Sequence, residues 1–169
     1  MLDDATGTVL AISRSFGTRY CPGRDRLAIG RSIGRSWFVA ATGLAIFTPP
    51  TIDPADPRHL LAAGAAGVTS DTVCRSFDPR VIESRDGGAT WAAVAPAPGL
   101  NLGSLAFDPV VPGRVYADGL DRLYRSGDGG RSWTALLGFP PGSAGVTLVA
   151  RSAPLVVRAD DGSLWRLSE

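Results

Sequence analysis

Several residue types are scarce or missing in this chain. All 17 basic residues are arginine, lysine and glutamine do not occur, and there are only one Asn, one His and two Cys. So few imidazole and thiol groups give no zinc-ligand pattern, and we expect neither a metal nor another cofactor. The formal net charge of +1 gives no electrostatic argument for nucleic acid as a partner.

Long apolar segments and catalytic fingerprints are also lacking. No apolar run reaches about 18 residues, so no membrane segment is predicted. The first residues do not form the charged and apolar regions of a signal peptide, and the cellular location stays open. The chain contains no H-E-x-x-H, P-loop or dinucleotide-binding motif.

Glycine and proline, in contrast, are frequent, with 21 and 13 residues in a chain of 169. That length suits one domain with a sizeable core. The many turn formers favour short strands over helices, and no segment shows a convincing helical period.

One turn motif occurs twice. Residues 84–91 (SRDGGATW) and 126–133 (SGDGGRSW) both read S-x-D-x-G-x-[ST]-W. The Asp carboxylate can accept hydrogen bonds from backbone N–H groups two residues on, and the glycines supply left-handed backbone. The Ser or Thr hydroxyl can bind the same loop, and the Trp that begins the next strand is an apolar anchor with one N–H to satisfy. We therefore expect a structural strand–turn–strand clip. Its residues are Ser84, Asp86, Gly88, Thr90 and Trp91 in one copy and Ser126, Asp128, Gly130, Ser132 and Trp133 in the other.

The motif belongs to a longer repeat. Asp86 and Asp128 are 42 residues apart, and upstream of them residues 52–64 align without gaps to residues 107–119. Two weaker copies flank these. Residues 25–37 align with residues 121–133 but carry Ser in place of the motif Asp, and residues 164–168 match the segment that starts at Leu123. The repeat therefore divides the chain into four units, at about 1–43, 44–98, 99–141 and 142–169.

Each full unit is predicted to contain four short strands, A to D, with the motif as the C–D turn. In the third unit they are 103–107, 114–117, 123–126 and 132–136, and in the second 45–51, 60–63, 81–84 and 90–94. In the first unit B, C and D are 8–12, 27–30 and 36–41, with little room for A; in the fourth A, B and C are 146–151, 155–158 and 164–167, without D. Such units predict an all-β fold, a β-propeller or propeller segment of about 3.5–4 four-stranded antiparallel blades, incomplete at both ends.

An incomplete ring would leave strand edges open. Three outcomes account for this: the chain is a fragment of a longer protein, it associates with a second copy, or it closes as a small, strained propeller. The remaining blades or self-association would then complete the ring.

The two intact motifs resemble the Asp-box, or bacterial neuraminidase repeat. Proteins with this motif include sialidases, sortilin-type receptors, xyloglucan-degrading glycoside hydrolases and photosystem II assembly-factor-like proteins. The D-P-x-x-P segments at 53–57 and 108–112 are most similar to the last three groups. The resemblance implies a β-propeller in an extracellular or periplasmic protein.

The resemblance does not supply a catalytic residue. The [FY]-R-I-P motif of sialidases is absent, and no arginine triad or catalytic carboxylate pair can be carried over. We therefore expect a non-enzymatic binding or assembly module within a larger extracellular protein. The alternative is a segment or remnant of a sialidase-like or xyloglucanase-like glycoside hydrolase.

Strand alternation indicates where a ligand would bind. The A–B and C–D turns share one end of each blade, and the B–C loops lie at the other end, which we call the loop end. Residues 13–25 and 65–80 are long B–C loops, and long loops on a rigid scaffold are common binding sites. The candidate ligand-binding residues are Arg14, Arg19, Tyr20, Arg24, Arg75 and Arg80. They suit an anionic glycan or an acidic protein segment; alternatively they are solvated loop residues balanced by nearby Asp side chains.

Four other residues have specific expectations. Cys21 and Cys74 occupy near-equivalent loop positions and either form a disulfide or remain two free thiols. His59 starts strand B, opposite the loop end, and is expected to be a surface or packing residue. Trp165 lies in strand C of the fourth unit and is expected in the core.

Overall fold

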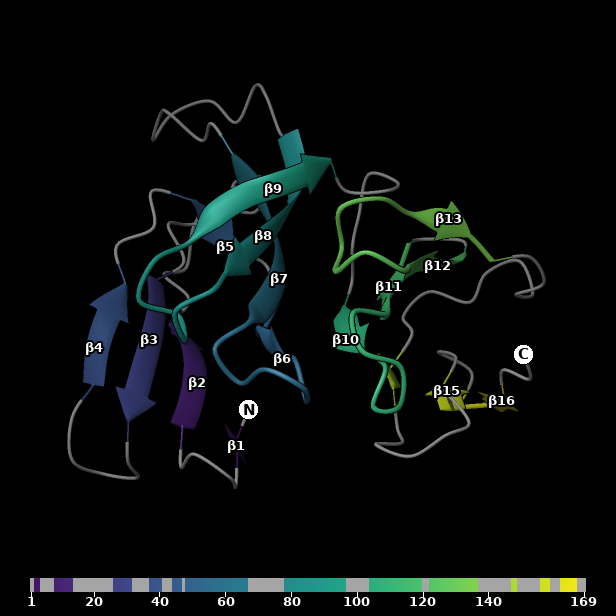
Figure 1. Ribbon diagram of the computed structural model, residues 1–169, viewed down its shortest axis with the longest axis horizontal. Coiled ribbons are helices and arrows are strands. Elements are labelled where there is room, and N and C mark those ends of the chain that lie inside the picture. Colours follow the sequence, from purple (N-terminus) through teal and green to yellow (C-terminus); the bar gives the residue numbers. More distant parts are fainter. Residues whose placement is uncertain are drawn as a thin grey trace.

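The computed structural model of the chain is entirely β in the part that it describes (Figure 1). The described residues are 2–3, 8–13, 26–31, 37–40, 44–46, 48–66, 78–96, 104–119, 122–136, 147–148, 156–158 and 162–166. Within them, no helix is long and apolar enough to cross a membrane.

The strands form four antiparallel sheets that follow the chain order. Sheet 1 contains β1 (Leu2–Asp3), β2 (Thr8–Ser13), β3 (Arg26–Arg31) and β4 (Trp37–Ala40). Sheet 2 contains β5 (Ala45–Ile46), β6 (Thr51–Ile52), β7 (Leu60–Ala66), β8 (Asp78–Ser84) and β9 (Ala92–Pro96). Sheet 3 contains β10 (Leu105–Phe107), β11 (Val115–Asp118), β12 (Leu123–Ser126) and β13 (Thr134–Ala135). Sheet 4 contains β14 (Thr147–Leu148), β15 (Val156–Arg158) and β16 (Leu164–Arg166).

The all-β fold of antiparallel four-stranded sheets is therefore confirmed. Two predictions about single strands were wrong. Sheet 1 has a strand A, because β1 pairs with β2 through Leu2 opposite Val9. Strand A of sheet 2 is split into β5 and β6, which both pair with β7. Pro49 and Pro50 lie between the two pieces, and a proline has no N–H to donate to the ladder.

Sheet 2 is buried on both faces. Leu61, Ala63 and Val81 point toward sheet 3, while Leu60 and Ile82 belong to a second apolar cluster on the opposite face. This explains why β7 reads as a continuous apolar run instead of an alternating one, since successive residues of a strand face opposite sides. A blade that needs cover on both faces is stable only when neighbouring blades stack on it.

The main core lies between sheets 2 and 3. Its buried members are Leu61, Ala63, Val81 and Ala95 from sheet 2 and Leu105, Phe107, Val115 and Ala117 from sheet 3. Trp165 is not part of it: its side chain is 41% exposed, so the prediction of a core position was wrong. Its indole N–H instead donates to Ser163 Oγ at 2.8 Å.

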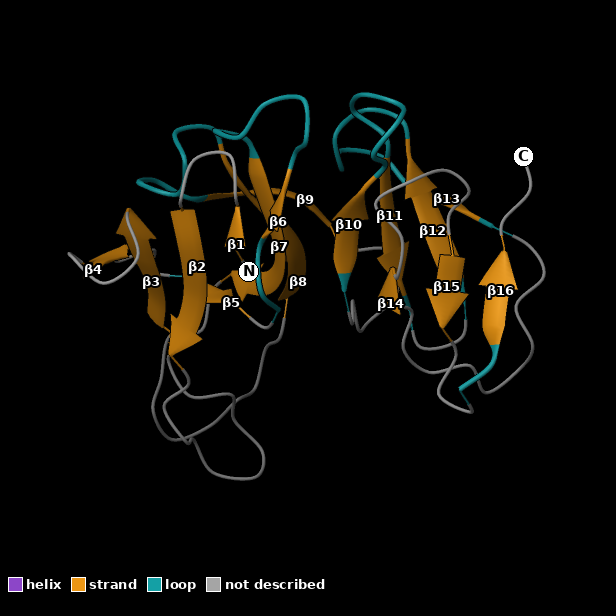
Figure 2. Cartoon of the chain, turned by 90° about the horizontal axis from the view of Figure 1, so that it is seen from below, coloured by secondary structure: helices purple, strands orange, loops and turns teal. Residues whose placement is uncertain are grey.

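The A–B and C–D turns lie together at one end, which we call the turn end (Figure 2, top). Backbone hydrogen bonds join them in both central sheets. Gly87 N donates to Arg58 O at 2.9 Å in sheet 2, and Gly129 N donates to Gly113 O at 2.8 Å in sheet 3. The predicted sharing of one end by these two turns is thus correct.

Candidate functional site

Asp128 organises the 126–133 turn at the turn end of sheet 3. Its Oδ1 accepts hydrogen bonds from Arg131 N at 3.0 Å and Ser132 N at 2.9 Å, and its Oδ2 accepts one from Ser132 Oγ at 2.6 Å. These amides belong to the third and fourth residues after Asp128, whereas the sequence predicted bonds from amides two residues after it. Gly129 and Gly130 between them have φ of 71° and 89°, a left-handed backbone that lets the chain wrap around the carboxylate.

The remaining polar groups of this turn also find local partners. Ser126 Oγ donates to Asp128 Oδ1 at 2.7 Å and accepts from Gly130 N at 2.8 Å. The Trp133 indole N–H donates to Gly130 O at 3.1 Å. The turn is therefore closed by its own side chains, and its Trp is committed to the scaffold.

The 84–91 turn of sheet 2 repeats this geometry. Thr90 supplies its N at 2.9 Å and its Oγ1 at 2.6 Å to the two oxygens of Asp86. Gly88 N donates to Ser84 Oγ at 2.8 Å, and the Trp91 indole N–H donates to Gly88 O at 2.9 Å. The same hydrogen bonds occur in both copies, so the shared sequence motif determines the conformation of both turns.

These hydrogen bonds keep both motif carboxylates ionised. The Thr90 hydroxyl is the largest cause that lowers the pKa of Asp86, to about 2, and the Thr90 amide adds to it. The Ser132 hydroxyl and amide lower the pKa of Asp128 in the same way. An anionic carboxylate that already accepts several hydrogen bonds is a poor general acid. The two turns therefore hold structure instead of offering protons for catalysis.

A polar cluster around the buried Glu83 carboxylate lies beside these turns, between sheets 2 and 3. We call it the Glu83 cluster; its members are Asp53, His59, Glu83, Arg85 and Arg131. His59, only 2% exposed, stands between two carboxylates: Nδ1 is 2.9 Å from Asp53 Oδ2, and Nε2 is 3.0 Å from Glu83 Oε1. The Nε2 atom is buried and makes no hydrogen bond in the described structure.

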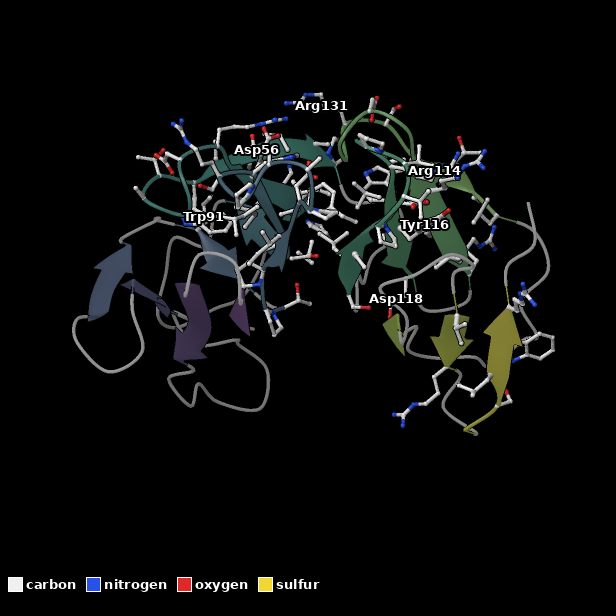
Figure 3. All side chains as sticks on the ribbon, turned by 60° about the horizontal axis from the view of Figure 1, so that its bottom comes forward. Asp56, Trp91, Arg114, Tyr116, Asp118 and Arg131 are labelled. Carbon is white, nitrogen blue, oxygen red and sulfur yellow. The ribbon has the colours of Figure 1, made fainter. Side chains whose placement is uncertain are left out.

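Two arginines reach Glu83 from different sheets. Arg85 of sheet 2 places Nε and Nη2 at 2.8 and 2.6 Å from Oε1. Arg131 comes from the turn of sheet 3, and its Nη2 lies 3.2 and 3.1 Å from Oε1 and Oε2. Figure 3 shows Arg131 at the turn end of the molecule. The cluster thus joins two blades through one carboxylate that is 8% exposed.

Sequence reasoning missed this cluster, although the repeat held a signal. Asp53 and His59 align with Asp108 and Arg114, and both pairs bring a basic side chain to an Asp. The Arg114 Nη1 to Asp108 Oδ2 distance is 3.6 Å. His59 was expected at the surface or in packing; it packs, with its ring edge-on to Phe107 at 5.0 Å between centroids.

Most of the predicted ligand-binding residues lie outside the described part of the chain. These are Arg14, Arg19, Tyr20, Arg24 and Arg75, together with Cys21 and Cys74. Arg80 was expected in a loop, which was wrong. It lies within β8, opposite Gly64 on β7 and Pro96 on β9, because β7 and β8 extend further than predicted, to Ala66 and Asp78.

At the loop end, Asp118 is buried at the end of β11. Its carboxylate accepts hydrogen bonds from Ser104 N and from Ser104 Oγ, the latter at 3.4 Å. Figure 3 places Asp118 far from Asp56 and Arg131 of the turn end. Asp118 therefore fastens β11 to the start of β10. Across the described residues, no group of three or more His, Cys, Asp or Glu side chains could hold a metal ion.

Three solved structures with a similar arrangement are GH74 glycoside hydrolases. A GH74 xyloglucanase from Xanthomonas campestris is 17% identical with a TM-score of 0.58, and the match covers 98% of this chain and 27% of that chain. A GH74 enzyme from Niastella koreensis is 16% identical with a TM-score of 0.61, and the covered shares are 98% and 29%. An ancestral GH74 enzyme is 16% identical with a TM-score of 0.53, and the shares are 98% and 24%.

The fold is that of a β-propeller. At these identities the likeness concerns the fold alone. The chain spans between 24% and 29% of the length of these enzymes. Neither a protein-family profile nor a curated protein matches the sequence.

Proposed function

We propose that the chain is a non-enzymatic binding or assembly module of the Asp-box propeller type, part of a larger extracellular or periplasmic protein. The observation that carries this proposal is that the described motif carboxylates and indoles of sheets 2 and 3 bind groups of their own turns. Asp86 and Asp128 close their turns, and Trp91 and Trp133 anchor them. Because these groups are used within the turns, the blades form a rigid scaffold, and a rigid scaffold is suited to hold loops that bind a ligand.

The ligand would bind at the loop end. The loops there carry Arg14, Arg19, Tyr20, Arg24 and Arg75 in the sequence. A guanidinium group recognises carboxylates and sulfates with two parallel hydrogen bonds, and the aromatic ring can stack on a sugar or side chain. An anionic glycan and an acidic protein segment are the ligand classes that fit this chemistry.

A second candidate is a segment of a glycoside hydrolase, which the likeness to GH74 enzymes over 98% of this chain favours. Glycoside hydrolysis normally needs two carboxyl groups about 5 to 9.5 Å apart. Asp118 lies at the appropriate end, but its carboxylate binds Ser104. The observation supports a scaffold role for Asp118 and favours the binding module.

Binding and hydrolysis assays on the same substrates separate the two candidates. The full chain is titrated with xyloglucan, a sialylated oligosaccharide and a sulfated glycan, and release of reducing sugar is followed in parallel. We expect binding without sugar release for at least one anionic glycan. Release of reducing ends from any of them would establish the hydrolase instead.

Variants locate the binding face. Arg19→Ala and Arg75→Ala should weaken glycan binding about tenfold each, the size of one lost charged hydrogen bond. Arg58→Ala is the matched control, because Arg58 is an exposed arginine of the turn end. Equal loss in all three variants would mean that binding reflects net charge, and the proposed binding face would be wrong.

A further inference from the structure

His59 lies at the boundary between sheets 2 and 3 and is enclosed by groups of both. The residue itself precedes β7 of sheet 2 and is buried. On the other side, its ring packs edge-on against Phe107 of β10. An ideal Cβ built on Gly129, in the turn of sheet 3, would lie only 3.7 Å from His59 Cε1. A change in the charge of this ring therefore acts on both blades.

The Glu83 cluster surrounds the ring with four charged side chains. Sheet 2 contributes Asp53, Glu83 and Arg85, and sheet 3 contributes Arg131. While the imidazole is neutral, the two carboxylates balance the two guanidinium groups. Histidine is the side chain whose charge ordinarily changes between pH 5 and pH 8. A proton on the ring would leave the cluster with one positive charge in excess.

Nε2 of His59 is the atom at which the proton would be taken up. Nδ1 lies 2.9 Å from Asp53 Oδ2 and carries the hydrogen of that bond, because an ionised carboxylate only accepts. In the neutral ring Nε2 is then an acceptor, and it lies 3.0 Å from another acceptor, Glu83 Oε1, without a hydrogen bond. A proton on Nε2 would place a charged donor opposite that oxygen, the combination that gives the stronger hydrogen bonds.

Glu83 Oε1 cannot bind every donor around it. Arg85 Nε and Nη2 lie 2.8 and 2.6 Å from this oxygen, and Arg131 Nη2 lies 3.2 Å from it. A carboxylate oxygen offers only about two lone-pair positions. A protonated Nε2 must therefore compete with the arginines. His59 is enclosed, whereas Arg131 is about half-exposed and makes the longest of these contacts, so Arg131 is the group that should give way.

Repulsion acts in the same direction. The ideal Cβ position of Gly129 lies 3.3 Å from Arg131 Nη1 and 3.7 Å from His59 Cε1. The same point lies 3.9 Å from Arg85 Nη2. A protonated ring would thus be a third cation beside two others, and like charges at such distances oppose each other.

We propose that His59 is a pH-sensitive switch in the contact between sheets 2 and 3. With the ring neutral, Glu83 holds Arg131 and so the turn of the next blade. Transfer of one proton from solvent to Nε2 binds Glu83 to His59 and releases Arg131, and no covalent bond other than the new N–H changes. The inference goes beyond the proposed function, because it holds whether or not the loop end binds a ligand.

The coupling between Glu83 and Arg131, measured at two pH values, tests the switch. Urea unfolding of the full chain, Glu83→Gln, Arg131→Gln and the double variant gives this coupling as a ratio of unfolding equilibrium constants. We expect a ratio of about fivefold at pH 8 and less than about twofold at pH 5.5. Ordinary Asp and Glu side chains stay ionised over this range, so a change within it points to histidine.

Two controls separate this effect from a general response to pH. His59→Asn keeps an amide N–H for Asp53 but takes up no proton, so the coupling in this background should be the same at both pH values. Asp108 and Arg114 form the equivalent pair of sheet 3, at 3.6 Å. Their coupling, measured with Asp108→Asn and Arg114→Gln, should also be unchanged. Circular dichroism checks that each variant keeps its β structure.

NMR of the unmodified chain supplies a readout that does not need the His59 variant to fold. The chain has one His, so the Cε1 proton signal needs no assignment. Arg131→Gln should let the ring take up its proton at higher pH than in the unmodified chain, because competition for Glu83 is reciprocal. Arg166→Gln removes the same charge from sheet 4 and should leave the titration in place.

Three results would each overturn the proposal. The first is an equal Glu83–Arg131 coupling at pH 8 and pH 5.5. The second is a coupling that depends on pH as strongly in the His59→Asn background, or as strongly for the pair in sheet 3. The third is a histidine titration that Arg131→Gln leaves where it is in the unmodified chain.

Discussion

Arg131 and Glu83 are 48 residues apart in the chain, and they meet across the boundary between two blades. Arg131 Nη2 lies 3.2 and 3.1 Å from the two carboxylate oxygens of Glu83. Glu83 is buried, while the Arg131 side chain is about half-exposed. The pair therefore combines a desolvated anion with a cation that keeps part of its hydration. We expect such an arrangement to fix how one blade is placed on the next more than it adds to total stability.

We expect Glu83→Gln to lower the free energy of unfolding by about 2 kcal/mol, because Arg85 and Arg131 lose their shared anion. Arg131→Gln should lower the free energy of unfolding by a smaller amount, since Arg85 still pairs with Glu83. In a double-mutant cycle the coupling between the two sites should be about 1 kcal/mol, limited by the solvent exposure of Arg131. Urea unfolding of the two single variants and the double variant measures it. Strictly additive effects would show that the contact does not couple the blades.

Stability should fall in acid, and the two motif aspartates determine the pH range. Both have a lower pKa in the folded protein than the ordinary value of 3.8, and that of Asp86 is about 2. The unfolded chain therefore binds protons first, so their stabilisation is complete above about pH 4 and is lost as the pH falls toward the folded pKa values. Urea unfolding between about pH 5 and pH 2 should show this decline.

Ser132→Ala tests the assignment of that pH dependence. The Ser132 hydroxyl is the largest cause of the lowered pKa of Asp128. Its removal should reduce the slope of stability against pH between about pH 4 and pH 2. Thr134→Ala, two residues on in exposed β13, is the matched control and should keep the original slope. The same slope in both variants would mean that other carboxylates carry the acid sensitivity.

Local features of the fold could be predicted from the sequence, because the repeat and the turn chemistry act over a few residues. Strand β12 was predicted at residues 123–126 and is observed as Leu123–Ser126. β1, in contrast, was not predicted, since two residues are too short for any alternating pattern.

Features that depend on stacked blades could not be predicted. The Glu83 cluster needs Arg131 from the next sheet, and no local pattern in β8 indicates that partner. Trp165 was expected in the core from its position in strand C, but its burial depends on what covers the sheet and not on its place in the repeat. The repeat thus predicted the architecture and the turns, while the charged contacts between blades required the structure.

Asp118 should contribute stability by fastening β11 to the start of β10. Asp118→Ala removes the acceptor of the Ser104 amide and should cost about 1–2 kcal/mol of unfolding free energy. Ser104→Ala removes only the longer hydroxyl contact at 3.4 Å and should cost less than about 0.5 kcal/mol. Urea unfolding compares the two variants. A larger cost for Ser104→Ala would contradict the role given to the carboxylate.

Gly130 joins the turn chemistry to the packing of the blades, so replacing it should be more damaging than replacing Gly127 or Gly162. Its φ is +89°, and an added Cβ would lie 3.2 Å from Leu61 Cδ1 of the preceding sheet. Gly130→Ala should therefore cost about 2–3 kcal/mol, as backbone strain and crowding of a packed core add together. Gly162 has a φ of +84°, and an added Cβ there would meet no atom within 4 Å. Gly162→Ala should therefore lower the free energy of unfolding by about 1 kcal/mol, from backbone strain alone. An added Cβ at Gly127 would meet no atom within 4 Å, so Gly127→Ala should leave the free energy of unfolding nearly unchanged. Thermal and urea unfolding rank the three variants; equal costs at Gly130 and Gly162 would show that contact with Leu61 is not what constrains this turn.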